Sequence, residues 1–175
     1  MKTKLNFYIL ILVVILLLFI LCYVLKKKEN YTNNKTHFKI IVPFYNLTYN
    51  ELKRCLVSIE NQNYNNYEVC IVDDASKKNT DDLKKIEKEY NLKKKCRYVK
   101  KKNNGGQISS NITGMETLKS KNEDVIVLVD GDDTLYDNNV LSYLNDIYSN
   151  NDILITYGNY SERRGNNILK TPMKN

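Results

Sequence analysis

The chain has 175 residues and a formal net charge of +7 at pH 7, with 42% hydrophobic and 27% charged residues. This length suits one domain of ordinary size, and the lack of any internal repeat in the sequence excludes a repeat protein. The densest basic stretch, "KKKCRYVKKK" (93–102), contains one aromatic residue. Nucleic-acid modules interleave several aromatics, so nucleic acid is not an expected partner. The ordinary interpretation is a solvated strand edge and loop, and attraction to an anionic membrane face is the alternative.

The first predicted element is a membrane anchor. Residues 7–25, "FYILILVVILLLFILCYVL", contain no charge, Gly, Pro or Asn. About 20 apolar residues are needed to cross the hydrocarbon core of a bilayer. Tyr8 and Tyr23 stand at the two ends, where aromatic rings favour the membrane interface. We expect an N-terminal tail and transmembrane helix over residues 1–28. A cleaved signal peptide is the alternative, although its apolar core usually has only ~7–15 residues.

The orientation of this anchor rests on weaker signals, because lysines flank both of its ends. After the anchor, Cys55, Cys70 and Cys96 are odd in number and lack metal-like spacing, which is typical of free thiols in a reducing compartment. The Asn-x-Ser/Thr sequons at Asn46 and Asn111 fall in predicted site loops, where a glycan would obstruct binding. We therefore expect a single-pass membrane protein with its soluble domain on the cytosolic side, the lumenal side being the alternative.

Residues 29–37 form a polar linker, and residues 38–160 alternate between strand-like and helix-like patterns before a polar tail at 161–175. The apolar runs predict strands at 39–44, 67–74, 96–99, 124–130 and 152–158. Helical periodicity predicts a helix over 50–62, a helix with Thr80 as its N-cap, a helix after "NNGG" (103–106) and a helix around 140–148.

This alternation predicts an α/β fold, with a mainly parallel sheet covered by helices on both faces in a Rossmann-like arrangement. In such sheets, ligands bind at the carboxyl ends of the strands. Three predicted strands end in polar residues at this edge. Pro43 to Asn46 end the first, Asp73 and Asp74 end the second, and an acidic trio ends the fourth.

The acidic trio consists of Asp130, Asp132 and Asp133, and it is interrupted by Gly131, which permits a tight turn. Carboxylate oxygens suit hard cations such as Mg²⁺ or Mn²⁺, usually with substrate phosphates completing the coordination. The alternative is a solvated turn in which Asp133 or Asp137 caps the next helix.

Two further features stand at the same predicted edge. Asp74 follows a buried strand, where we expect it to be exposed at the strand end, so that its carboxylate can accept from a nucleobase N–H or a ribose hydroxyl. The alternative is a turn in which Asp74 or Ser76 bonds nearby backbone. Gly105 and Gly106 precede a helix, so their N–H groups can face phosphate. The alternative for this pair is an ordinary loop.

Together and in this order, four stretches resemble the family 2 glycosyltransferases, which have the GT-A fold. The stretches are "IIVPFYN" (40–46), "LKRCLVSIENQNYNNYEVCIVDDAS" (52–76), "NNGGQISSNITG" (103–114) and "VLVDGDDTLYDN" (127–138). Each stretch alone is a weak signal, but their order and spacing are specific. The resemblance covers residue 39 to about residue 160.

The resemblance implies a metal-dependent enzyme that transfers a sugar from a nucleotide-diphosphate sugar, with UDP as the expected nucleotide, to an unknown glycan, lipid or protein acceptor. The implied metal ligands are Asp132 and Asp133, holding Mn²⁺ or Mg²⁺. Asp130 and Asp132 correspond to the Asp-x-Asp motif of the family, which binds the ribose and, through the metal, the diphosphate. The implied nucleotide-sugar-binding residues are Pro43, Tyr45, Asn46, Asp74, Gly105, Gly106 and Asp130.

The sequence departs from the family pattern in two places. The family has an Arg-Asn pair where this chain has Asn111 and Ile112, so a phosphate-facing cation is expected from elsewhere, for example from Lys102. The family's second half would follow residues 152–158, and the general base is expected beyond residue 175, which leaves the catalytic residues unknown.

Two other functions stay open at this point. One is a donor-binding module of the same fold without turnover. The other is a receiver domain, which also gathers acidic residues at strand ends but needs a Lys at the end of its fifth strand. Here that strand is expected to end in "TYG" (156–158).

Overall fold

The computed structural model describes residues 13–23, 35–91, 93, 95–150, 153–164 and 167–170. Its elements are β1 (Phe38–Phe44), α2 (Tyr49–Glu60), β2 (Tyr67–Asp73), α3 (Thr80–Asn91), β3 (Cys96–Lys100), α4 (Gly106–Thr117), β4 (Val125–Leu128), α5 (Val140–Asn150), β5 (Ser161–Arg164) and β6 (Asn167–Lys170). From β1 to α5 the predicted order of strands and helices is confirmed.

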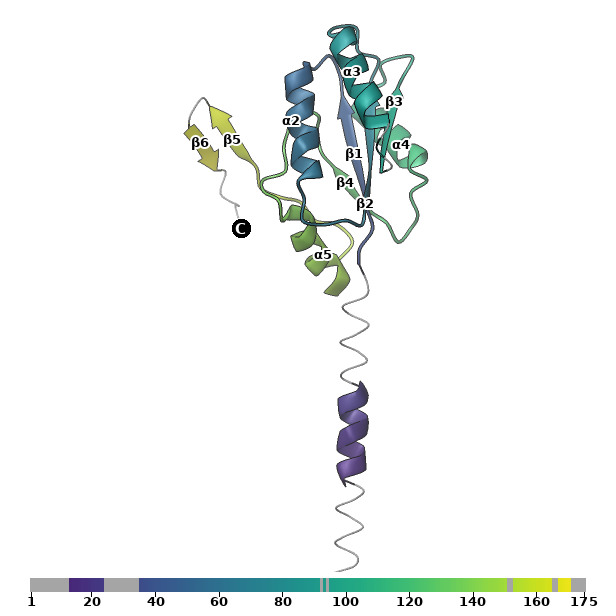
Figure 1. Ribbon diagram of the computed structural model, residues 1–175, viewed down its shortest axis with the longest axis vertical. Coiled ribbons are helices and arrows are strands. Elements are labelled where there is room, and N and C mark those ends of the chain that lie inside the picture. Colours follow the sequence, from purple (N-terminus) through teal and green to yellow (C-terminus); the bar gives the residue numbers. More distant parts are fainter. Residues whose placement is uncertain are drawn as a thin grey trace, which may run out of the picture.

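The sheet has four parallel strands in the order β3-β2-β1-β4 (Figure 1). In chain order, β2 pairs with one side of β1, β3 is added beyond β2, and β4 then pairs with the other side of β1. The strand order therefore reverses between β1 and β4. At such a switch point the loops diverge to opposite faces, which leaves a crevice at the carboxyl ends of the two strands.

The helices cover both faces of the sheet, as predicted. Phe38, Ile40 and Val42 point from β1 into the larger core cluster, which also takes in α2, α3 and Leu141 of α5. Ile41 points the other way, into a smaller cluster under α4 with Cys70 and Leu118. This alternation follows from the two-residue period of a strand. Figure 1 shows α2 and α4 on opposite sides of the sheet.

Helix α2 illustrates how the local sequence sets an element. Thr48 and Glu51 form a reciprocal capping box that satisfies two backbone N–H groups at its start. Its buried residues are the four predicted from the helical spacing, Leu52, Cys55, Leu56 and Ile59. The loop that leads into this helix, residues 45–48, is thereby fixed in place beside the end of β1.

Three details of the prediction were wrong. Helix α3 begins at Thr80 itself, so Thr80 is its first residue rather than its N-cap. Strand β4 ends at Leu128, two residues early. The strand expected at 152–158 is not formed over 153–158, where Leu154 and Tyr157 are 94% and 88% exposed. A β5–β6 hairpin lies within the predicted polar tail instead.

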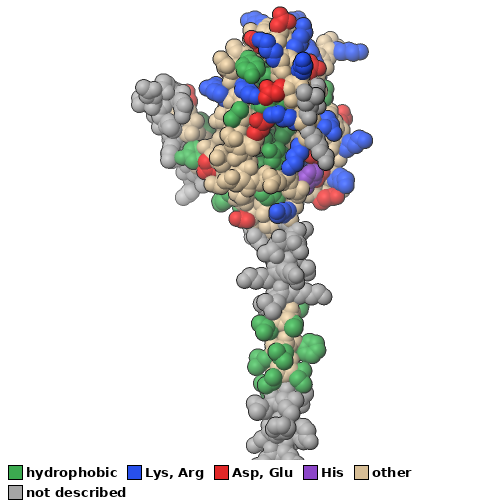
Figure 2. Space-filling model, viewed as in Figure 1, with side chains coloured by type: hydrophobic (Ala, Val, Ile, Leu, Met, Phe, Trp, Pro, Cys, Tyr) green, Lys and Arg blue, Asp and Glu red, His purple; other side chains and the backbone are tan. Residues whose placement is uncertain are grey.

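Of the predicted anchor, residues 13–23 are described and form a helix, while residues 7–12 and 24–25 lie outside the described part of the chain. The large apolar side chains of this helix are exposed, and Figure 2 shows them around its surface. Within the described residues, no helix has the length and apolar character that crossing a membrane requires.

Candidate functional site on the sheet rim

The carboxyl ends of β1, β2 and β4 are joined by backbone hydrogen bonds beyond the regular sheet. The N–H of Asp74 donates to Phe44 O at 2.9 Å, and the N–H of Gly131 donates to Pro43 O at 3.1 Å. Regular pairing of β1 with β4 ends at Ile41. Pro43 lies beyond this point, so the N–H group that proline lacks does not remove a hydrogen bond between β1 and β4. The three loops predicted to carry the site, at residues 43–46, 73–76 and 130–133, therefore meet at one edge of the sheet, the rim.

The loop after β1 is locked to the loop after β2. Asn46 has a positive φ of 56°. Its side-chain oxygen accepts from the backbone N–H groups of Lys77 and Lys78 at 2.8 and 3.0 Å, and its own N–H donates to Ser76 Oγ at 2.8 Å. Of the predicted nucleoside-binding residues in this loop, Pro43 is buried and Asn46 is tied to backbone, whereas Tyr45 is 43% exposed.

Asp73 and Asp74 are adjacent but have different partners. Asp73 is fully buried and shapes the turn, because it accepts from the N–H of Ser76 at 2.7 Å and from the hydroxyl of Tyr98 at 3.3 Å. Burial, and next the charge of Asp73, raise the pKa of Tyr98. This phenol therefore stays protonated and remains a donor to Asp73.

Asp74 accepts from the predicted glycine pair and from a lysine. Its carboxylate receives Lys101 Nζ at 2.6 Å, Gly105 N at 3.0 Å and Gly106 N at 2.8 Å. Burial alone would raise the pKa of Asp74, but the hydrogen bonds from Lys101 and from the two glycine N–H groups outweigh burial and hold the pKa below its ordinary value. The carboxylate is therefore ionised at neutral pH.

These contacts correct one expectation. Asp74 was expected to be exposed on the rim, but it is 4% exposed because the turn into α4 closes over it. The cation beside it is Lys101. Lys102, the cation expected to face a phosphate, is exposed. The parallel pairing of β2 with β3 could have identified Lys101 as the partner of Asp74. It sets Asp73 opposite Lys100, and therefore carries Lys101 to the position beside Asp74.

Other basic residues of the 93–102 stretch also have partners. Lys93 pairs with Glu60, and Lys100 lies 3.5 Å from Asp73. Figure 2 shows Lys and Arg side chains gathered over the end of the domain that holds α3. Part of this positive charge therefore neutralises acidic groups of the domain itself.

The acidic trio follows β4. Gly131 is needed at its centre, because a Cβ atom there would lie 2.7 Å from Phe44 Cβ. Asp130 is partly buried, and one of its carboxylate oxygens accepts from Gln107 Nε2 of α4 at 2.5 Å. Asp132 and Asp133 are exposed. Residues 104–107 thus touch both acidic groups of the rim, Asp74 through backbone and Asp130 through a side chain.

The acidic trio has no ion pair within the described part of the chain. Among the described residues, no Lys, Arg or His forms an ion pair with Asp130, Asp132 or Asp133. Desolvation, and next the charges of Asp132 and Asp130, raise the pKa of Asp133. Beneath them, burial together with these three charges raises the pKa of Cys55 to about 12. That thiol is therefore not a nucleophile near neutral pH.

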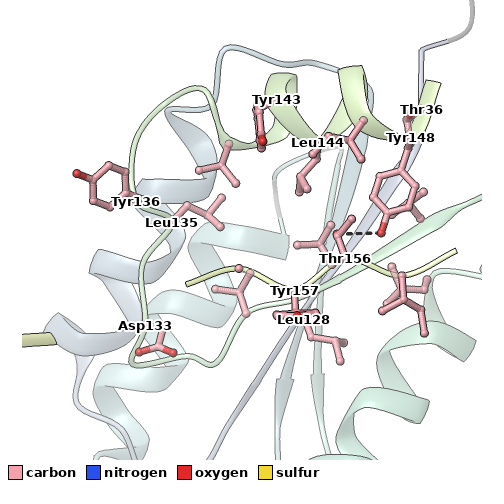
Figure 3. Close-up of a pocket in the computed structure, with 18 of the residues that line it drawn as sticks. Thr36, Leu128, Asp133, Leu135, Tyr136, Tyr143, Leu144, Tyr148, Thr156 and Tyr157 are labelled. Carbon is pink, nitrogen blue, oxygen red and sulfur yellow. Dashed lines mark hydrogen bonds between the residues drawn. The ribbon is translucent and has the colours of Figure 1, made fainter. Parts of the chain in front are cut away.

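An open hollow of about 2220 Å³ extends from the trio along β4 and α5 to residues 153–162. In Figure 3, Asp133 stands at one end, and the side chains of Leu128, Leu144 and Tyr157 lie farther along. The hydroxyl of Tyr148 and Thr156 Oγ1 are 3.0 Å apart within it. Asp74 is not part of this lining, so the hollow lies beside the trio and does not reach Asp74.

Comparison with known proteins bears on the identity of this rim. The model of glycosyl transferase family 2 matches residues 39–174. The glycosyltransferase GlyG of Streptococcus pneumoniae is 30% identical over 130 residues, which are 73% of this chain and 41% of GlyG. A structure of S. aureus TarS, residues 1–349, has a TM-score of 0.50 and 26% identity over 65% of this chain and 32% of that one.

TarS in complex with UDP-GlcNAc has a TM-score of 0.50 and 24% identity over 65% of this chain and 30% of that one, a likeness of fold. The chain thus spans less than half the length of these relatives. The family match nevertheless extends over more than half of the chain and includes every predicted site residue. The chain therefore belongs to glycosyl transferase family 2.

Proposed function

We propose that this chain binds a nucleotide-diphosphate sugar and takes part in transferring its sugar to an acceptor, with a UDP sugar as the donor. One observation carries the proposal: the ionised Asp74 and the acidic trio lie on the same rim, at the carboxyl ends of parallel strands and around the point where the strand order reverses. A nucleoside end and a diphosphate end of one ligand need two such positions side by side.

The nucleoside end is assigned to Asp74 and the loop after β1. An ionised carboxylate accepts hydrogen bonds only, and uracil offers its N3–H as a donor. Tyr45 is exposed beside this position and provides an aromatic ring for the base or the ribose. TarS, which shares the fold, has been crystallised with UDP-GlcNAc, so UDP is the first nucleotide to test.

The diphosphate end is assigned to the trio, with Mn²⁺ or Mg²⁺ held by Asp132 and Asp133 and with Asp130 on the ribose. No group of three His, Cys, Asp or Glu side chains within the described residues is arranged to hold a metal by itself. This fits a hard cation that takes one or two carboxylates and completes its coordination with substrate phosphates. When bound, the cation would neutralise charge on the departing diphosphate. The exposure of Asp132 and Asp133 leaves their oxygens open for such binding.

The N-terminal segment is proposed to anchor the domain in a membrane, with the domain on the cytosolic side. Residues 7–25 carry no charge, and the large side chains of the described helix are apolar and exposed. After alkaline extraction of membranes, the full chain should stay in the pellet, and a variant lacking residues 1–28 should be found in the supernatant. Extraction of both would contradict the anchor.

A donor-binding module without turnover is the second candidate, because the chain spans only 41% of GlyG. The two candidates share the donor site and differ in reaction. Release of UDP from UDP-GlcNAc by the chain alone, measured with a coupled assay, would favour the enzyme. Binding of UDP without release of product would favour the module.

Titration calorimetry of the chain with UDP tests the donor site. We expect binding in the presence of Mn²⁺ or Mg²⁺ and a loss of at least about tenfold in affinity with a chelator. Asp81→Asn is the matched control for Asp132→Asn, because the Asp81 side chain is 90% exposed on α3 and its one ion pair among the described residues is with Lys84. Equal affinity with metal and with chelator would contradict the metal role, and no binding under either condition would contradict the proposed function.

A further inference from the structure

The hollow beside the acidic trio is lined by more carboxylates than cations. Seven Asp or Glu residues line it, against three basic residues, which are Lys35, His37 and Arg54. A divalent cation held by Asp132 and Asp133 would be offset by those two carboxylates, so the charge of a bound diphosphate would stay uncompensated. An anionic donor in this hollow therefore needs a further cation, and the protein has to supply it.

Arg54 lies on α2 beside the trio. Two nearby residues of the same helix contact the loop that carries the trio: Cys55 Sγ donates to Asp130 O at 3.6 Å, and Ser58 Oγ accepts from Leu135 N at 3.0 Å. Arg54 stands four residues before Ser58, so both lie on the face of α2 that meets this loop. The side chain of Arg54 is exposed and lines the hollow together with the trio.

The guanidinium of Arg54 forms no ion pair and no hydrogen bond within the described part of the chain. Glu51, one turn earlier on α2, is engaged in the capping box with Thr48. The hydrogen bonds with Thr48, more than the charge of Arg54, lower the pKa of Glu51. A guanidinium presents a planar fork of N–H donors that matches the oxygens of a phosphate. Arg54 therefore has its donors available for an anionic ligand.

The other candidates for a phosphate contact are engaged or lie elsewhere. Lys35 and His37 precede β1, so they lie at the opposite edge of the sheet, where His37 is 2.8 Å from Asp124. Lys101 is already in an ion pair, and Lys102 does not line the hollow. The glycine N–H groups at the start of α4 donate to the carboxylate after β2. Among the described residues that line the hollow, Arg54 is thus the one cation beside the trio.

We propose that Arg54 is the phosphate-binding cation of the donor site, and that its guanidinium donates hydrogen bonds to the diphosphate of the nucleotide sugar. This inference rests on the proposed function of the rim. It places the phosphate-facing cation on α2, whereas the corresponding position of α4 holds the neutral Asn111. Because a guanidinium stays protonated throughout the working pH range, the contact does not depend on pH near neutrality.

The test compares UDP with uridine, which carries the same nucleoside and no phosphate. Binding of each to the full chain is followed by ligand-observed NMR, once with Mg²⁺ and once with a chelator. We expect Arg54→Met to weaken UDP binding by about tenfold or more and to change uridine binding by less than about twofold. The loss should persist with the chelator, because the protein makes this contact without the metal. Arg54→Lys should recover part of the affinity, since it keeps the charge and loses the fork.

Lys88→Met is the matched control. It removes one positive charge from an exposed position on α3 that does not line the hollow. Because solvent and salt screen a distant exposed charge, its UDP affinity should equal that of the wild type. An equal loss in Lys88→Met and Arg54→Met would show an effect of net charge alone and would overturn the inference.

The remaining outcomes separate this inference from the proposed function. An Arg54→Met variant that binds UDP as tightly as the wild type overturns the inference and leaves the proposed function standing. A loss of UDP and uridine alike would show that Arg54 shapes the nucleoside position, and a loss seen only with Mg²⁺ would show that it acts on the trio. Either result overturns the phosphate contact. If the wild type binds no UDP, the proposed function itself fails. Should Arg54→Met not fold, Arg54→Lys carries the test, and an unchanged UDP affinity in that variant overturns the inference.

Discussion

The carboxylate of Asp74 and those of the acidic trio lie on one rim, and the protein compensates their charges in different ways. Asp74 is 4% exposed and paired with Lys101, with two glycine N–H groups completing its hydrogen bonds. Asp132 and Asp133 are exposed, and no cation among the described residues pairs with them. The pKa of Asp74 is accordingly lowered, while that of Asp133 is raised.

This difference separates what the fold supplies from what a ligand must supply. The position at Asp74 is complete before any ligand arrives, so its residues belong to the stability of the domain as well as to binding. The trio is crowded and open, so its residues cost stability in the free protein, and a bound cation would offset that cost. Substitution of Asp74 should therefore lower stability more than substitution in the trio does. Substitutions in the trio should act mainly on ligand binding.

The largest effect is expected for Asp74→Ala. The substitution leaves the ammonium of Lys101 without its carboxylate and two N–H groups without their acceptor, at a position where the carboxylate is almost fully buried. Removing one partner of a buried pair costs about 3 kcal/mol. We expect the free energy of unfolding from urea titration to fall by about that amount. The same substitution at Asp132 should change it by less than about 0.5 kcal/mol.

An Asp74→Ala variant as stable as the Asp132→Ala variant would contradict the expected difference in stability between the two regions. It would show that the contacts of Asp74 form no more than a solvated turn. Asp81→Ala is the exposed control, and its stability should match that of the wild type.

A smaller loss is expected for Gly106→Ala. Gly106 has a φ of +77°, and a Cβ atom there would meet nothing within 4 Å, so the cost is that of the backbone conformation alone. A left-handed conformation costs an alanine about 1–2 kcal/mol. Gly158→Ala is the matched control, because its Cβ atom would also meet nothing and its φ lies outside the left-handed range. Equal melting temperatures for the two variants would contradict a role of Gly106 in presenting its N–H to Asp74.

The pH dependence should also separate the two regions. The stabilising contribution of Asp74 is complete above the ordinary carboxyl pKa of 3.8, and it is lost as the pH falls through the lowered pKa of the folded state. Asp133 has the opposite sign, because its raised pKa means that protonation on acidification relieves repulsion and adds stability. Carbon-detected NMR titration should place Asp74 below 3.8 and Asp133 above it. A common pKa for Asp74 and Asp133 would contradict the electrostatic difference between the two regions.

The sequence predicted most of the fold because its signals are local. The apolar runs and helical spacing that define β1 to α5 are carried by neighbouring residues, and their order alone implies a parallel sheet. The strand expected at 152–158 failed because a strand needs a partner. Apolar composition at Ile153 to Tyr157 does not by itself provide pairing with the edge of β4.

For the site, the sequence predicted which strand ends meet, since parallel strands present their carboxyl ends at one edge. It did not predict that Asp74 is buried or that Lys101 is its partner. Both depend on the turn before α4 folding back onto the loop after β2, a contact between residues about 30 positions apart in the chain. Propensity carries no information on such a contact, although the register of β2 and β3 does.

The smallest effect on stability, and the sharpest on binding, is expected for Asp132→Asn. Asparagine keeps the shape and hydrogen-bonding oxygen of aspartate, so the substitution removes charge alone. The pKa of Asp133 should then move back toward its ordinary value, because one of the two like charges that raise it is gone. The free domain should be as stable as the wild type, or more stable by up to about 0.5 kcal/mol, since exposed charges interact weakly. UDP with Mn²⁺ should raise the melting temperature of the wild type and not that of the variant. If Asp132 served only to close the turn after β4, both signs would reverse: the variant would melt earlier, and the shift caused by the ligand would persist.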